Sequence, residues 1–175
     1  MSRKASLLWV DLEMTGLSPE EDRILEGSFI ATDWKLREVG RMSVVVKVDE
    51  ELMKRRMRGE FWEKNADSRR GLMEQNGRGV SRRSAERAVL EMMGEYFGKE
   101  VYLAGNSVYQ DRKFIEKEWP KVAERVHYRM LDVSAWKVWF EHVRGVKMKK
   151  LDGHRAEGDV EASIFEFRKY LEFVK

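Results

Sequence analysis

The order of secondary-structure signals along the chain limits its fold more than any other feature. Three strand-like segments come first, and the apolar residues after them recur with helical spacing. The strand-like segments are residues 7–13, 24–32 and 42–48, and a short connection at Asp33-Trp34-Lys35 joins the last two. We expect these segments to form an antiparallel meander, because strand patterns separated by a short turn pair in this way.

The second part of the chain alternates between helix and strand. Short apolar strands are expected at 101–104 and 128–131, with a helix between them at 110–119. A further helix is expected to start near Ser84, and Ser134 is the expected N-cap of a helix rich in aromatic residues. The terminal helix carries one apolar stripe, formed by Val160, Ile164, Phe167, Leu171 and Val174. Strands first, then alternating helix and strand, predict an α/β fold in which helices cover a sheet.

Length and composition bound the classes of protein that remain. The chain has 175 residues, of which 42% are hydrophobic and 37% charged, and this size predicts one domain over residues 1–175 with a real core. The absence of cysteine excludes disulfides, thiol nucleophiles and cysteine-bound metal centres. No apolar run approaches the roughly 18 residues of a membrane span. A short N-terminus without a signal-peptide pattern makes the cytoplasm the expected compartment, with a mitochondrial or nuclear fraction left open.

Basic side chains gather in one part of the chain. The net charge is only +3, but residues 53–87 hold 11 Lys or Arg against 5 Asp or Glu. Such a run is typical of a solvated helical face, and it could also attract the phosphates of a nucleic acid. The run therefore keeps an RNA-binding module open as one interpretation.

Two carboxylates stand at the end of the first strand. Leu8, Val10 and Leu12 are expected on one side of this strand, so Asp11 and Glu13 share the other side. Two like charges placed together in a partly buried position are costly unless a cation lies between them. Because hard cations prefer carboxylate oxygens, the pair is a candidate metal site.

Three other residues could complete a site with this pair. Asp111 follows the strand at 101–104 and stands at the start of the next helix, where the carboxyl ends of strands assemble sites in α/β sheets. His154 lies in a glycine-containing loop, and Asp159 is expected to begin the terminal helix. A histidine beside a metal cluster can act as a general base near neutral pH.

The combination of motifs resembles a known family. The chain has Asp-x-Glu-x-Thr-Gly from Asp11, Gly-Asn-Ser-x-x-x-Asp ending at Asp111, and His-x-Ala-x-x-Asp from His154 to Asp159. This order resembles the histidine-containing branch of the DEDD 3′→5′ exonucleases, and within that superfamily the chain is most similar to the oligoribonucleases. The resemblance covers residues 7 to about 170, a span that includes nearly the whole chain.

The resemblance implies a fold, a reaction and a set of site residues. The fold would be that of a ribonuclease-H-like exonuclease, with a mixed central sheet flanked by helices. Short single-stranded RNA would be hydrolysed to 5′-mononucleotides by a homodimer. The acids Asp11, Glu13, Asp111 and Asp159 would hold two divalent cations, Mg²⁺ or Mn²⁺, and His154 would be the general base. Substrate contacts would come from Leu17 as a wedge against terminal bases and, at the 5′ phosphate, from Ser107, Tyr128, Arg129 and Ser134.

Two positions depart from the family pattern. Gly158 stands where relatives commonly carry a second aspartate, and no histidine follows Trp62 within residues 63–67. In the family that histidine helps to grip bases, so a preference for the shortest substrates is left open. A 3′→5′ exonuclease acting on DNA or on longer single strands, and a catalytically silent RNA-binding module, remain the alternatives.

Overall fold

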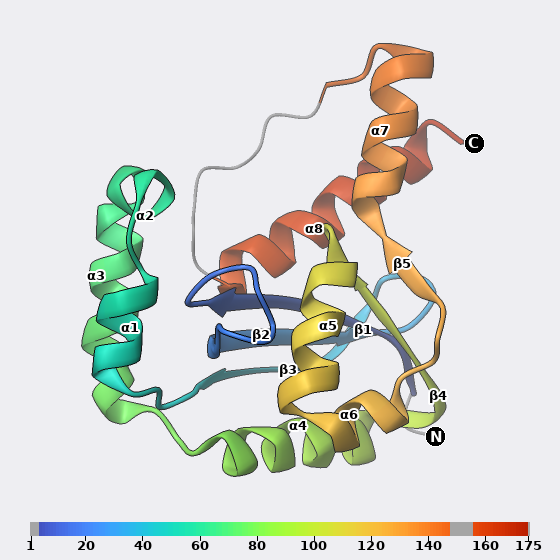
Figure 1. Cartoon of the computed structure of the whole chain (residues 1–175). Helices are drawn as coiled ribbons and strands as arrows, with labels where there is room; N and C mark the ends of the chain where they lie inside the picture. Colours follow the sequence, from blue (N-terminus) through green and yellow to red (C-terminus); the bar gives the residue numbers. More distant parts are fainter. Residues whose placement is uncertain (1–3, 148–155, 175) are drawn as a thin grey trace.

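A five-stranded mixed sheet forms the centre of the molecule (Figure 1). The computed structural model describes residues 4–147 and 156–174. The strand order is β3-β2-β1-β4-β5. Strand β2 pairs antiparallel with both β1 and β3, whereas β4 runs parallel to its neighbours β1 and β5. The strands are β1 (Ala5–Met14), β2 (Ile24–Thr32), β3 (Glu38–Val45), β4 (Phe97–Gly105) and β5 (Met130–Asp132). The expected antiparallel meander and the α/β fold with a mixed sheet are confirmed.

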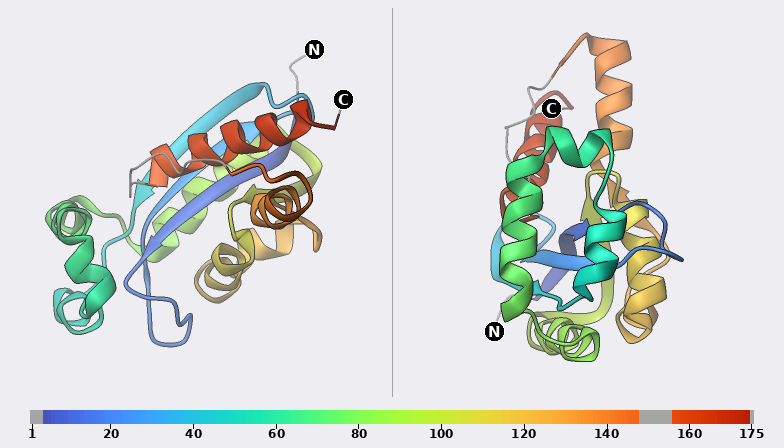
Figure 2. Two further views of the ribbon diagram at one scale, coloured as in Figure 1. Left: turned by 90° about the horizontal axis from the view of Figure 1, so that it is seen from above. Right: turned by 60° about the vertical axis from the view of Figure 1, so that its left-hand side comes forward.

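Helices cover both faces of this sheet. Among the described residues they are α1 (Glu50–Arg56), α2 (Glu60–Lys64), α3 (Ala66–Gln75), a short 3₁₀ turn (Asn76–Arg78), α4 (Arg82–Tyr96), α5 (Val108–Glu118), α6 (Pro120–Arg125), α7 (Val133–Arg144) and α8 (Ala156–Glu172). Figure 2 shows α4 and α8 on opposite faces of the sheet, and α1 to α3 grouped beyond one end of it. No helix in this part of the chain combines the length and the apolar character that a membrane span needs.

The alternation of β1 decides which face receives the two carboxylates. Leu8, Val10 and Leu12 pack in a core with side chains of α4, α5 and α6. On the other face, Leu7 and Trp9 pack against apolar side chains of α7 and α8. Fully burying one such side chain is worth about 1.5–3 kcal/mol, so both faces hold the strand in this register. Asp11 and Glu13, which share the parity of Leu7 and Trp9, consequently lie on the side of α8.

A third, smaller core joins α1 to α3. Met53, Met57, Trp62 and Leu72 are buried there against Leu25 and Val48 of the sheet region. The basic run at 53–87 thus includes helices with an apolar inner side, while Arg55 and Arg58 are exposed. The interpretation of this run as a solvated helical face holds for these outer side chains.

Three local expectations were wrong. The N-cap of α7 is Asp132, whose side chain accepts the Ser134 amide hydrogen bond, so Ser134 lies inside the first turn. The terminal helix begins at Ala156, which places Asp159 in its first turn, and Val174 lies beyond its end and is exposed. Strand β3 begins at Glu38, four residues before the expected start at residue 42. The left-handed backbone of Leu36 (φ 58°) makes a tight turn after β2, so the next strand can start directly after it.

Candidate active site

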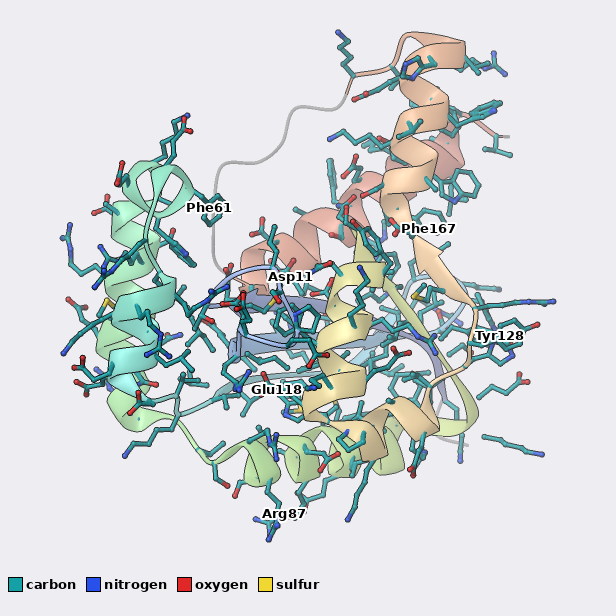
Figure 3. The ribbon with its side chains drawn as sticks, in the orientation of Figure 1. Asp11, Phe61, Arg87, Glu118, Tyr128 and Phe167 are labelled. Atoms are coloured by element: carbon teal, nitrogen blue, oxygen red, sulfur yellow. The ribbon has the colours of Figure 1, made fainter. Side chains whose placement is uncertain are left out.

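Three carboxylates meet where β1 ends beside the first turn of α8. Asp11 and Glu13 come from β1 and Asp159 from α8, and one oxygen of each lies within 4.8 Å of the others. All three side chains are partly buried, and Figure 3 shows Asp11 near the start of α8. Oxygens gathered so closely from residues far apart in the sequence suit a hard divalent cation. Among the described residues, these three form a group that fits the metal site expected from the sequence.

Asp111 approaches the same strand from its edge. Its carboxylate accepts a hydrogen bond of 2.9 Å from the backbone amide of Leu12, which lies between Asp11 and Glu13. Strand β4 ends at Gly105, and its pairing with β1 stops at Trp9. Beyond that point the Leu12 amide of β1 donates to the carboxylate of Asp111 instead of to a carbonyl of β4. The fourth acid is therefore next to the group of three, attached to the strand backbone.

Burial changes the proton affinity of Asp111. Its side chain is buried, and desolvation is the main cause that raises the pKa of its carboxyl to about 7. The nearby charges of Glu13 and Asp132 raise this pKa further, whereas the Leu12 amide lowers it. A carboxyl that is buried beside other acids has a raised pKa because its negative charge is not compensated, and a bound cation would supply that compensation.

Ser107 and Ser134 meet at the carboxyl ends of β4 and β5. Their hydroxyl oxygens are 3.0 Å apart, and the Ser107 amide donates to Ser134 Oγ at 2.8 Å and to Asp132 Oδ1 at 3.1 Å. Ser107 has a left-handed backbone (φ 50°), which these acceptors stabilise. Asp132 was missed by the sequence reasoning, although an aspartate just before a helical segment is a common N-cap signal.

Leu17 lies on the loop that follows β1. Its side chain is 75% exposed, and its carbonyl accepts a hydrogen bond of 2.7 Å from Gln110 Nε2 of α5. The loop is therefore attached to the helix that carries Asp111. The role of Leu17 as a wedge against the terminal base stays a prediction.

Tyr128 and Arg129 are not brought to the acids within this chain. The Arg129 guanidinium lies 5.2 Å from the centre of the exposed Tyr128 ring, just before β5. Figure 3 shows Tyr128 at one edge of the molecule, well away from Asp11. Their assignment to a 5′-phosphate contact stays a prediction. His154, the expected general base, lies outside the described residues.

The sheet and its flanking helices have the fold of solved exonuclease I structures. Exonuclease I from Methylocaldum szegediense matches with a TM-score of 0.65 and 16% identity over 97% of this chain and 42% of that one. Exonuclease I of E. coli in complex with a dA13 oligonucleotide matches with a TM-score of 0.64 and 13% identity, over 97% and 41% of the two chains. This chain spans about two fifths of those structures, and the likeness shows the fold.

Sequence comparisons specify the family. The exonuclease family model named for RNase T matches residues 8–167. A probable oligoribonuclease of Dictyostelium discoideum is 36% identical over 96% of this chain and 90% of its own length. The oligoribonucleases of Chromobacterium violaceum and Vibrio campbellii are 36% and 37% identical, over 95% and 97% of this chain and 94% and 95% of their own lengths. The chain belongs to the RNase T exonuclease family, in its oligoribonuclease group, and it is a metal-dependent 3′→5′ exonuclease.

Proposed function

We propose that this protein degrades short single-stranded oligoribonucleotides from the 3′ end and releases 5′-mononucleotides. The observation that carries the proposal is the group of Asp11, Glu13 and Asp159, whose oxygens converge within 4.8 Å in a chain similar over nearly its full length to oligoribonucleases. The three apolar clusters around one sheet support a single exonuclease domain over residues 1–175.

The acids are the residues that would hold two divalent cations, Mg²⁺ or Mn²⁺. When bound, such ions supply charge neutralisation at the phosphodiester and stabilisation of the leaving 3′ oxygen. Asp11, Glu13 and Asp159 present oxygens to one point, and Asp111 is held beside them by the Leu12 amide. The chain thus supplies four anionic groups to a site that would be strongly repulsive without cations.

His154 is the proposed general base. In the sequence it precedes Asp159 by five residues, on the segment that leads into α8. An imidazole with an ordinary pKa near 6.5 can accept a proton from the attacking water at neutral pH, which contributes roughly 10²–10⁴-fold. The proton acceptor and one proposed metal ligand would then come from the same short stretch of chain.

The substrate contacts come from two places beside the acids. Leu17 would pack against the terminal base, because its side chain is exposed on the loop that follows Glu13. The hydroxyl pair of Ser107 and Ser134 offers hydrogen bonds to a phosphate at the ends of β4 and β5. Tyr128 and Arg129 are assigned to the 5′ phosphate by the family resemblance. Because one chain does not bring them to its own acids, this contact would need an arrangement that a single chain does not provide.

A homodimer is the proposed assembly. Trp139, Val143 and Val174 are each more than half exposed at the outer end of α7 and the end of the chain. A hollow of about 400 Å³ next to them is lined by Ala135, Trp136, Trp139, Phe140 and Val174. Contiguous apolar surface of this kind is typical of protein interfaces, and a second copy would remove it from water. The proposed compartment is the cytoplasm, and a mitochondrial or nuclear fraction would be compatible with the same activity.

The test uses a ladder of 5′-labelled oligoribonucleotides and matched oligodeoxyribonucleotides. We expect metal-dependent shortening from the 3′ end, fastest on the shortest RNA, and loss of cleavage with a chelator or in the Asp11→Ala variant. Faster cleavage of DNA or of long strands would instead assign the protein to a proofreading type of exonuclease. Binding of RNA without any cleavage in Mg²⁺ or Mn²⁺ would identify a binding module.

A further inference from the structure

A buried carboxylate lies in the loop between β1 and β2, apart from the four acids of the site. Asp22 is fully buried, and its two oxygens accept four hydrogen bonds. Within the loop, Thr15 Oγ1 donates to Oδ1 at 2.9 Å and the Ser18 amide to Oδ2 at 3.0 Å. The loop is therefore wrapped around this one side chain.

The other two hydrogen bonds come from helix α1. Arg56 donates through Nε to Oδ1 of Asp22 at 2.8 Å and through Nη2 to Oδ2 at 3.0 Å. This is the two-pronged geometry in which a guanidinium recognises a carboxylate most strongly. Burial alone would raise the pKa of Asp22, but the hydrogen bonds from Arg56, Ser18 and Thr15 outweigh it and leave the pKa below its usual value. Arg56 also lies 3.2 Å from a carboxylate oxygen of Glu21.

The ion pair fixes the part of the loop that presents Leu17. A Cβ at Gly16 would lie 2.5 Å from Asp22 Oδ2, so the backbone directly before Leu17 passes against the carboxylate. Trp62 Nε1 reaches the Thr15 carbonyl at 3.3 Å from the same group of helices. On the opposite side, Gln110 of α5 holds the Leu17 carbonyl at 2.7 Å. The loop segment that carries the exposed Leu17 is thus held on one side by residues of α1 and α2 and on the other side by a residue of α5.

Helix α1 itself is anchored in the third core. Met53 and Met57, on either side of Arg56 in the sequence, are buried with Trp62 and Leu72. The backbone of α1 is consequently fixed by packing on either side of Arg56, and a side chain on a rigid element can position another one. We propose that Arg56 is a positioning residue: through its ion pair with Asp22 it sets the place of Leu17 and thereby the affinity for the terminal nucleotide of the substrate. The inference rests on the proposed function, in which Leu17 contacts that nucleotide.

The test compares Arg56→Met, Arg56→Lys and the control Arg55→Met. Met removes the guanidinium but keeps an unbranched apolar chain, and Arg55 is the exposed neighbour on the same helix. For a labelled trinucleotide RNA we measure kcat and KM in Mg²⁺. The dissociation constant is measured by fluorescence anisotropy in Mg²⁺ with His154→Ala as the common background, in which cleavage is expected to be lost. Amide hydrogen exchange of residues 15–23 reports the order of the loop.

For Arg56→Met we expect KM and the dissociation constant to rise about tenfold, which corresponds to about 1.4 kcal/mol. The value of kcat should stay within about twofold, because the acids are not altered, and exchange in residues 15–23 should become faster. Arg56→Lys should recover part of the affinity, since an ammonium is a point charge and cannot form the two-pronged contact. Arg55→Met should match the wild type in all these measurements.

An unchanged KM and dissociation constant in Arg56→Met, with an active wild type, would overturn the inference. So would a loss confined to kcat. A wild type that leaves RNA intact would contradict the proposed function instead, and the anisotropy and exchange measurements would still decide the role of Arg56. Circular dichroism shows whether Arg56→Met folds. If it does not, the double variant Asp22→Asn with Arg56→Met, which also removes the buried charge, is used in the same assays in place of the single variant.

Discussion

The close approach of β4 to β1 allows a stability prediction with a built-in control. A Cβ added at Gly105 would lie 2.7 Å from the carbonyl oxygen of Val10, and both positions belong to paired strands. Neither backbone can move aside as a flexible side chain could. Gly105→Ala is therefore expected to push β4 away from β1 directly before the turn that leads to Asp111.

The size of the effect follows from this distance. An ordinary contact of this kind begins near 3.4 Å, so the strands must separate locally by several tenths of an ångström. Inserting a methyl group into a packed region typically costs about 1–3 kcal/mol. For a domain of about this length, 1 kcal/mol shifts Tm by about 2–4 °C. We expect a Tm lower by about 4–8 °C for a middle value of about 2 kcal/mol.

Gly94→Ala is the matched control. Gly94 lies within α4, and a Cβ there would meet nothing within 4 Å. Alanine in an open helical position gains about 0.5–1 kcal/mol over glycine, so the same chemical change should raise Tm at this position. Thermal unfolding followed by circular dichroism measures both variants. A Gly105→Ala protein as stable as the wild type would contradict the expected clash between β4 and β1.

Four further predictions concern the site, the loop and the assembly. Asp11→Ala should abolish cleavage and weaken Mn²⁺ binding in calorimetry, because it removes one of three convergent oxygens. His154→Ala should lose turnover at neutral pH and keep Mn²⁺ binding. Because Arg56 helps to hold the pKa of Asp22 below its usual value, the ion pair should stabilise the fold above pH 4 and lose this effect as the pH falls through the folded-state pKa. The difference in the free energy of unfolding between the wild type and Arg56→Met should thus shrink from pH 7 to pH 3 in urea titrations. Trp139→Ser should shift a dimer toward monomer in analytical ultracentrifugation.

Each of these four has an outcome that would contradict it. Glu91→Gln, an exposed acid on α4, is the control for Asp11→Ala, and equal activity of the two variants would exclude Asp11 from the metal site. Full turnover of His154→Ala at neutral pH would remove it as the base. A stability difference for Arg56→Met that grows toward acid pH would reverse the sign argued for Asp22. A monomeric wild type at micromolar concentration would refute the dimer.

The placement of Asp11 and Glu13 on one face of β1 was predictable from the local pattern. The side chains of a strand alternate between its two faces, and Leu7 to Glu13 shows this alternation in the sequence alone. The two resulting cores confirm the predicted sides. The structure places Asp111 and Asp159 in the first turns of α5 and α8, within a few residues of the helix starts expected from the sequence.

Details of how the ends of helices are capped were less predictable. Ser134 and Asp132 are both good capping residues two positions apart, and local propensity does not separate them. The structure selects Asp132 because its carboxylate also accepts the amide of Ser107, 25 residues earlier in the chain. A long-range contact thus decided a choice that neighbouring residues left open.

The order of the elements, the faces of β1 and the residue types of the site follow from local sequence, because they depend on neighbours within a few positions. The contact of Asp111 with the Leu12 amide, 99 residues apart, and that of Arg56 with Asp22, 34 residues apart, arise only when the chain is folded. Such contacts depend on where β4 ends and on how the third core positions α1. Strand lengths and core packing are set by the whole chain at once, and no local pattern carries them.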